Sequence, residues 1–138
     1  LPNLRILGVD FGSRRIGIAL AESEFGIGSA RPSLPASGTL AKDAEAIAAV
    51  ARREQADAVV VGIPENPGDE RMSRVCHQLA EKIRALGLTV HTVDESLTTA
   101  LAEADLSAQG LKASKIRRQK DGESARRILD RFLSETRT

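Results

Sequence analysis

A chain of 138 residues with 41% hydrophobic residues is long enough to bury one core, so we expect a single domain over residues 1–138. Its 20 Lys and Arg residues against 19 Asp and Glu residues leave a net charge of +1, which excludes a general electrostatic attraction to polyanions. With three Phe and no Trp or Tyr, the composition argues against base-stacking modules of the RRM or OB type.

The first elements predict a hairpin that carries an acidic residue. The mostly apolar run over residues 5–12 predicts a buried strand with Asp10 near its carboxyl end. A turn and a second apolar run over residues 16–20 complete the hairpin. Taken alone, Asp10 is either a carboxylate delivered to a site or a turn residue that accepts hydrogen bonds from nearby amides. Arg14 and Arg15 add two cations beside it.

The middle of the chain alternates strands and helices. Residues 26–34 are typical of a third strand, and Thr39 can cap a helix that ends near residue 55. The continuous apolar run over residues 57–64 is too short for a helix and predicts a central parallel strand. An amphipathic helix over residues 72–86 follows.

A fifth strand is predicted before two adjacent acids. β-Branched residues from Thr89 onward favour a short strand that ends in Asp94 and Glu95, and the Ser and Thr residues after them favour a helix start. The order of elements predicts an α/β fold with a mixed five-stranded sheet and helices on both faces. Asp10 and Glu95 would both lie at carboxyl ends of strands, where open α/β sheets place their sites. Alternatively, Asp94 and Glu95 are solvated acids near a helix amino terminus, stabilised by ~0.3 to 1 kcal/mol each.

The last helix carries a third acid on its apolar stripe. The stripe repeats at offsets of three, four, seven and eight residues and comprises Ala125, Ile128, Leu129, Phe132 and Leu133. Asp121 lies four residues before this stripe, which puts it on the buried face. Because an unpaired buried carboxylate is costly, a cation is its expected partner, although Asp121 could instead cap the helix. Three acids from separate elements thus suggest a divalent-metal site.

A basic stretch precedes Asp121. Its cations are Lys112, Lys115, Arg117, Arg118 and Lys120, with no acid among them. Beside a metal cluster, this stretch could hold a phosphodiester backbone, and it could equally be a solvated loop. From its polarity and lack of periodicity we expect it to be disordered in the absence of substrate.

The remaining chemistry-bearing residues indicate no further site. Cys76 falls on the apolar face of a predicted helix, so we expect a core residue, and one cysteine excludes an intrachain disulfide. His77 is expected to be exposed, and neither His nor Cys has zinc-site spacing. No apolar run approaches the ~18 to 20 residues of a membrane span. We therefore expect a cytoplasmic protein without a membrane partner.

Four blocks of sequence resemble the YqgF/RuvX family in order and over nearly the whole chain. They are LGVDFGSRRIG at residues 7–17, VVVGIPEN at residues 59–66, DESLTT at residues 94–99 with Ala102 and Glu103, and Asp121 followed by Ser124, Ala125, Ile128 and Leu129. The resemblance implies an RNase H-like fold related to Holliday-junction resolvases, and a nuclease that processes the 5′ end of the 16S ribosomal RNA precursor. The acidic positions of the family fall on Asp10, Glu95 and Asp121.

The chain also departs from the family pattern. Ser96 replaces an Arg, Glu22 stands where Asp is common, and residues 67–71 differ from the usual Met-Asp-Gly pattern. These changes imply a different grip on the substrate. In the usual strand order, the strand before Glu95 lies two places from that of Asp10, roughly 10 Å across the sheet.

Together these observations predict metal-dependent phosphodiester hydrolysis. Asp10 would bridge two Mg²⁺ or Mn²⁺ ions, with Glu95 and Asp121 completing their ligand shells. The substrate would be structured RNA, with pre-ribosomal particles as partners. One alternative is a Holliday-junction resolvase that cuts branched DNA as a dimer. The other is a non-catalytic nucleic-acid-binding or ribosome-binding protein whose acids are structural.

Overall fold

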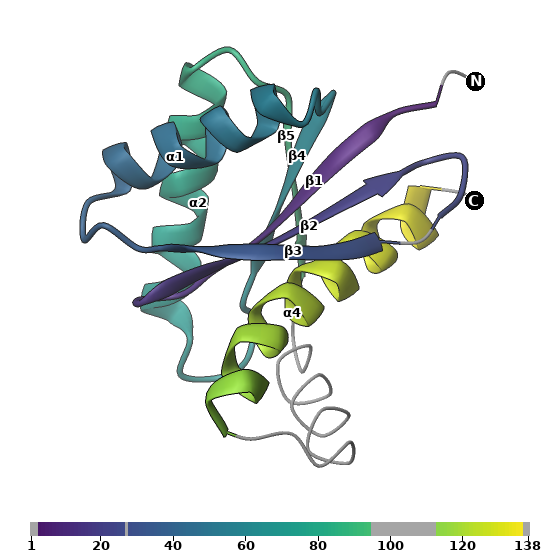
Figure 1. The fold of residues 1–138 in the computed structure, drawn as a ribbon. Helices are drawn as coiled ribbons and strands as arrows, with labels where there is room; N and C mark the ends of the chain where they lie inside the picture. Colours follow the sequence, from purple (N-terminus) through teal and green to yellow (C-terminus); the bar gives the residue numbers. More distant parts are fainter. Residues whose placement is uncertain (1–2, 27, 95–112, 137–138) are drawn as a thin grey trace.

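The computed structural model describes residues 3–26, 28–94 and 113–136, with residues 113–121 and 136 described by their backbone alone. In this part of the chain, five strands form one sheet in the order β3-β2-β1-β4-β5 (Figure 1). The strands are β1 (Arg5–Phe11), β2 (Arg15–Glu22), β3 (Gly28–Pro35), β4 (Ala58–Ile63) and β5 (Val90–Asp94). Strands β1, β2 and β3 pair antiparallel, whereas β4 is parallel to β1 and β5. The predicted mixed sheet is confirmed, and β5 lies two places from β1.

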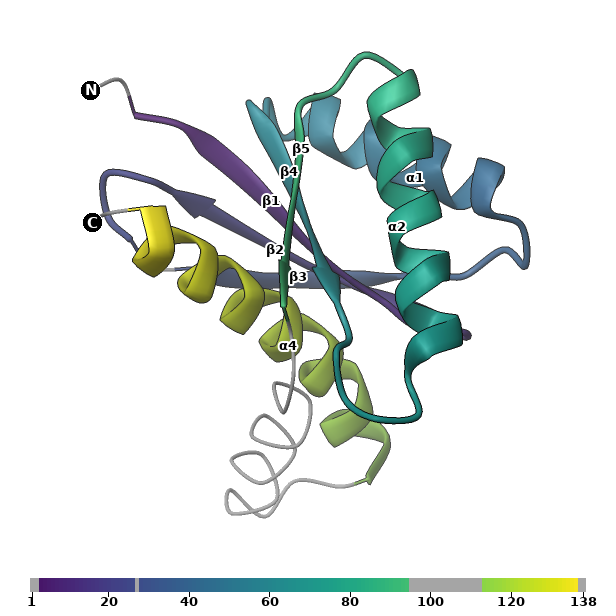
Figure 2. The same ribbon diagram turned by 180° about the vertical axis from the view of Figure 1, so that it is seen from behind.

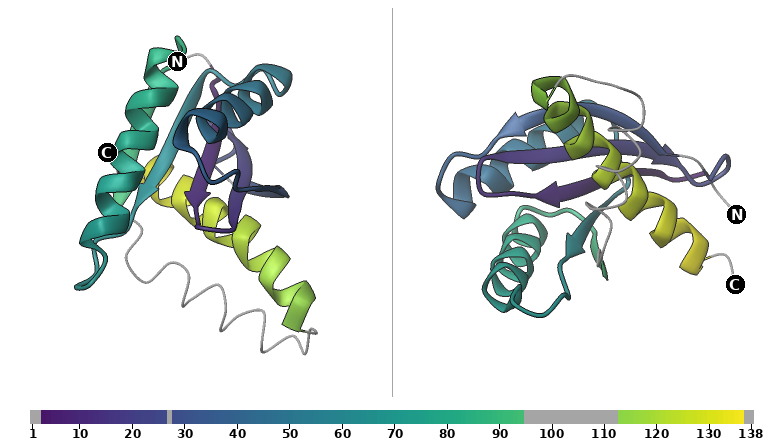
Figure 3. Two further views of the ribbon diagram at one scale, coloured as in Figure 1. Left: turned by 90° about the vertical axis from the view of Figure 1, so that its left-hand side faces the viewer. Right: turned by 90° about the horizontal axis from the view of Figure 1, so that it is seen from below.

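Within the described ranges, three helices cover the sheet. Helices α1 (Leu40–Arg53) and α2 (Glu70–Ala85) lie together on one face, and α4 (Ala113–Thr136) crosses the other, as Figure 2 and Figure 3 show. Helix α2 ends in a turn where Gly87 adopts φ 94°, a conformation that glycine accepts without the strain of a Cβ. Helices on both faces were expected. None of the described helices has the length and apolar character needed to cross a bilayer.

Strand alternation divides the core into two clusters. Leu7 and Val9 of β1 are buried against α1 and α2, whereas Ile6 packs in the cluster under α4. The residues of β4 are all buried, and their side chains alternate between the same two clusters. Cys76 is fully buried on the α1/α2 side and His77 is exposed, as predicted. Each strand therefore presents successive side chains to two different environments.

Helix α4 packs directly on the backbone of β1. A Cβ atom on Gly8 would lie 2.6 Å from Leu129 Cγ and 2.9 Å from the Ala125 carbonyl oxygen, so only glycine permits this approach. The Gly28 N–H donates to Asp130 Oδ1 at 3.1 Å, while Gly122 lies against Ala30, further along β3. Helix α4 therefore runs antiparallel to β3 and β1, and its amino-terminal half lies toward the carboxyl end of β1.

Two expectations for the segment before this contact are wrong. Helix α4 begins at Ala113, so Asp121 lies inside the helix and cannot cap its start. Residues 113–120 are helical, so the alternative of a solvated loop is wrong for them, whereas their disorder without substrate stays a prediction. They lack an apolar stripe because this end of α4 projects beyond the sheet (Figure 1), yet Ala, Lys, Arg and Gln are good helix formers.

Candidate functional site

Asp10 lies in a row of the sheet where its neighbours have no side chains. It is half-buried near the carboxyl end of β1, and alternation places it on the α4 face, two residues after Gly8. Its partner on β2 is Gly17. On β4 the register pairs Val9 with Val61, so Gly62 occupies the next position beside Asp10. Because neither glycine has a side chain, the flanking strands contribute only backbone beside this carboxylate.

The backbone of residue 121 approaches the same end of β1. Residue 121 lies one helical turn before Ala125, which contacts Gly8, and α4 runs antiparallel to β1. The helix therefore continues from Gly8 toward the level of Asp10. The backbone of Asp121 lies in this part of α4, and its side chain is not described, so its grouping with Asp10 stays a prediction. The third predicted acid, Glu95, lies outside the described residues.

Asp94 is the last residue of β5 and is described without its neighbour Glu95. Val90 packs on the α1/α2 side and Val93 on the α4 side, so alternation places Asp94 on the face opposite to Asp10. Gly62 pairs with Val93, which continues the row of Asp10 onto β5. Asp94 is therefore not a candidate ligand, and the prediction that names Glu95 remains untested.

Two of the predicted cations, Arg14 and Arg15, directly follow the end of β1. Arg14 is exposed in the turn between β1 and β2, and Arg15 is half-buried at the start of β2. The first two turns of α4 contain Lys115, Arg117, Arg118 and Lys120, of which the backbone is described. Lys112 and Ser96 lie outside the described residues. Among the described side chains, no three His, Cys, Asp or Glu residues form a metal-binding group, but this set excludes Glu95 and Asp121.

Ser124 is a polar residue that sequence reasoning did not assign to the site. Its side chain is fully buried, and among the described residues its Oγ has no hydrogen-bond partner. A buried hydroxyl without a partner costs about 1 to 3 kcal/mol. Ser124 lies three residues after Asp121 and beside Ala125, so it belongs to the part of α4 that meets β1 near Asp10. The sequence signals were its place in the fourth block that resembles the family and a hydroxyl on the inner side of an amphipathic helix.

The chain matches known proteins over almost its full length. The model of a family described as "RuvX: Holliday junction resolvase" matches residues 4–135. A relative from Anaeromyxobacter sp. (strain Fw109-5), named "Putative pre-16S rRNA nuclease", is 40% identical over 134 residues, covering 94% of this chain and 96% of the relative. A relative of the same name from Opitutus terrae is 34% identical over 136 residues, covering 96% of this chain and 92% of the relative.

A solved structure shares the fold. RuvC of Thermus thermophilus, in complex with a Holliday junction substrate, superposes with a TM-score of 0.61 at 12% identity, covering 98% of this chain and 97% of RuvC. The expected RNase H-like fold is thereby confirmed.

Proposed function

Because this chain belongs to the RuvX family, we propose that it is a metal-dependent nuclease that processes the 5′ end of the 16S rRNA precursor. The observation that carries this proposal is the 40% identity, over 94% of the chain, to a relative named for pre-16S rRNA cleavage. The fold shared with RuvC supports the same class of phosphodiester chemistry. The position of Asp10 at the carboxyl end of β1 provides a carboxylate where such a site is expected.

The described residues fit a divalent cation at this place. Asp10 would supply a hard oxygen ligand, Gly17 and Gly62 on the adjacent strands add only backbone beside it, and Ser124 has a buried hydroxyl without a partner in the described chain. We propose that Asp10, Glu95 and Asp121 hold one or two Mg²⁺ or Mn²⁺ ions. When bound, such ions activate an attacking water and stabilise negative charge on the phosphate.

The protein residues have separate tasks in this proposal. Asp10 is fixed by a central strand, so its carboxylate is oriented before the substrate arrives. Arg14 is exposed in the adjacent turn and can pair with a phosphate of the backbone. The basic amino-terminal end of α4 extends this positive edge beyond the sheet (Figure 1). Backbone contacts of this kind position a nucleic acid without reading its sequence.

Cleavage of two substrates side by side tests the proposal. An RNA that spans the 5′ end of mature 16S rRNA and a four-way DNA junction are incubated with Mg²⁺, Mn²⁺ or EDTA. We expect cleavage of the RNA with either ion and none in EDTA. Glu95→Gln and Asp121→Asn should abolish it, while Glu135→Gln, an exposed acid near the far end of α4, should not.

The other outcomes distinguish the alternatives. Symmetric cuts in the junction with intact RNA would replace the rRNA assignment by that of a resolvase, which requires a dimer in solution. Binding of either substrate without cleavage under all conditions would support a non-catalytic binding protein. Full activity of Asp121→Asn with Mn²⁺ would refute the proposed ligand set.

A further inference from the structure

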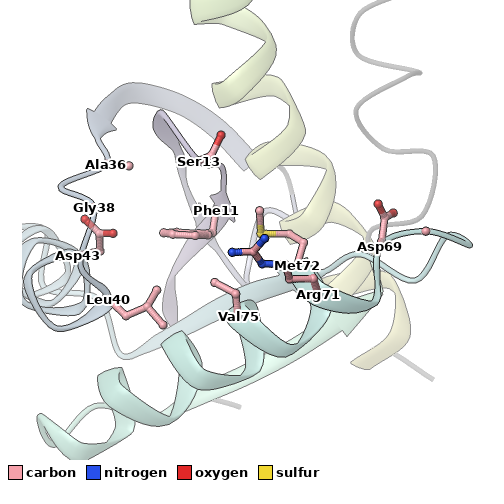
Figure 4. Close-up of a pocket in the computed structure, with 11 residues that line it drawn as sticks. Phe11, Ser13, Ala36, Gly38, Leu40, Asp43, Asp69, Arg71, Met72 and Val75 are labelled. Carbon is pink, nitrogen blue, oxygen red and sulfur yellow. The ribbon is translucent and has the colours of Figure 1, made fainter.

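A pocket lies on the opposite face of the sheet from Asp10. It has a volume of about 580 Å³ and lies between the end of β1, the start of α1 and the start of α2 (Figure 4). Its size is within the range of about 300 to 1,000 Å³ that is typical of small-molecule sites. The proposed metal site uses none of its lining residues.

The inner surface of this pocket is apolar and includes an aromatic ring. Phe11 lies at the centre of the lining, with Leu40 on one side, Met72 on the other and Val75 beneath, as Figure 4 shows. Phe11 is half-buried, packed against the α1/α2 core but open to the pocket. Such a surface accommodates a flat apolar group, and a planar ring can stack on Phe11.

Arg71 is a charged hydrogen-bond donor of the pocket. It lines the pocket from the first turn of α2, and its guanidinium is drawn near Phe11 in Figure 4. The exposed Arg71 has no hydrogen bond or ion pair to another described residue, in contrast to Arg84 and Arg52. Its donors are therefore available to a ligand.

Carboxylates stand at both ends of the same pocket. Asp43 is 2% exposed and accepts a hydrogen bond of 2.8 Å from the Ser37 N–H through Oδ1. Asp69 precedes α2 at the other end of the lining. Nearby, hydrogen bonds from the backbone of Glu70 itself and of Gly68 lower the pKa of the exposed Glu70 below its ordinary value. With two carboxylates and one guanidinium, the pocket disfavours a free phosphate and suits a neutral ring with both donors and acceptors.

The pocket is joined to the proposed cleavage site through consecutive residues of β1. Asp10 faces α4 and Phe11 faces α1 and α2, and both lie at the carboxyl end of the strand. Ser13, in the turn between β1 and β2, lines the pocket, and its neighbour is the exposed Arg14. A nucleic-acid strand that passes over this turn, with a phosphate at Asp10, can therefore place an adjacent nucleotide at Phe11.

We infer that the pocket between β1, α1 and α2 receives an unstacked nucleobase of the substrate, with guanine preferred. Guanine presents O6 and N7 as acceptors for an Arg and its N1–H and N2–H₂ as donors for a carboxylate. Uracil presents mainly carbonyl acceptors, which a carboxylate repels. The inference deepens the proposed function, because it takes nucleic acid as the substrate. The low aromatic content argued against base-stacking modules. A single base, however, needs only one aromatic ring beside a pocket, and Phe11 provides it.

Binding of mononucleotides in EDTA tests the inference independently of cleavage. The backbone amide NMR signals of Phe11, Ser13, Met72 and Val75 are followed while GMP, UMP or inorganic phosphate is added to the ¹⁵N-labelled protein. We expect saturable shifts with GMP, about tenfold weaker binding of UMP, and no saturable shift with phosphate. Because no bond is cleaved, a failure of the nuclease proposal leaves this readout unchanged.

Two variants and a matched control locate the binding. Arg71→Gln removes a charge-assisted hydrogen bond and should weaken GMP binding about tenfold. Arg74→Gln, an exposed arginine three residues along α2 that does not line the pocket, should change it less than about twofold. Phe11→Leu keeps an apolar side chain but removes the stacking surface, and should also weaken binding about tenfold.

Three results would overturn the inference. These are the absence of saturable GMP shifts at the pocket amides, phosphate binding equal to that of GMP, and an Arg71→Gln variant with unchanged GMP affinity. Since Arg71 is exposed, its replacement leaves the core intact, so a negative result cannot be ascribed to unfolding.

Discussion

The two faces of the sheet differ in how their chemistry changes along the strands. The face under α1 and α2 is apolar from Leu7 through Val9 to Phe11. The face under α4 begins with Ile6 and changes, over Gly8 to Asp10, into a surface of small and polar groups. The same strands build both, because successive side chains point to opposite faces. Away from the pocket at Phe11, the first face thus serves mainly stability, while the second offers a charged group at its carboxyl edge.

The largest expected effect is the difference in nuclease activity between variants of two aspartates, one on each face. Asp10→Asn should lower nuclease activity by at least about 1000-fold with little change in stability, because a neutral amide is a poor ligand for a hard cation. Asp94→Asn, at the matching edge on the other face, should change activity by no more than about threefold. Initial cleavage rates in Mn²⁺, with thermal unfolding as the folding control, measure both. Similar losses in the two variants would contradict the assignment of the faces.

A core substitution under α1 should lower stability and leave cleavage per folded molecule almost unchanged, the reverse of Asp10→Asn. Ile47 is fully buried there, so Ile47→Ala should lower the free energy of unfolding by about 2 to 5 kcal/mol. Cleavage per folded molecule should stay near that of the wild type at a temperature where the variant is folded. Denaturant titration gives the stability, and active-site titration gives the folded fraction. If the cleavage rate per folded molecule fell as far as in Asp10→Asn, the packing under α1 would also shape the cleavage site at Asp10.

Gly8→Ala should lower both the free energy of unfolding and the cleavage rate. The added Cβ would meet Leu129 and the Ala125 carbonyl, so α4 must shift, at a cost of about 1 to 3 kcal/mol. Since α4 also carries Asp121, the cleavage rate should fall with stability. Paired measurements of unfolding and cleavage check this coupling. Unchanged activity in a destabilised variant would separate the packing of α4 on Gly8 from the site.

The smallest expected effect concerns the buried hydroxyl of Ser124. Ser124→Ala removes a polar atom without a partner in the described chain, so the metal-free protein should gain about 1 kcal/mol of stability. Mn²⁺ affinity should fall about tenfold if the hydroxyl supports the ions, as residues behind metal ligands commonly do. Ser134→Ala, at an exposed position of α4, is the matched control. A stability gain with unchanged Mn²⁺ affinity would exclude this role for Ser124.

Much of the fold followed from local patterns. The uninterrupted run before Pro64 predicted a central strand, and β4 is buried at every residue. The apolar stripe from Met72 to Leu86 predicted α2, and Gly87 ends it. The position of Asp10 near the end of β1 was likewise evident. The start of α4 was missed because a helix that projects beyond the sheet has no apolar stripe to reveal it.

The sequence by itself determined which residues form strands and which side chains alternate between faces, because backbone geometry sets these short-range periods. Only the tertiary structure decided which turn of α4 meets which residue of β1. That choice depends on the close packing of Leu129 on Gly8, residues more than a hundred positions apart. It likewise decided that Ser124 is buried and that Phe11 lines a pocket, because both properties come from elements distant in the chain.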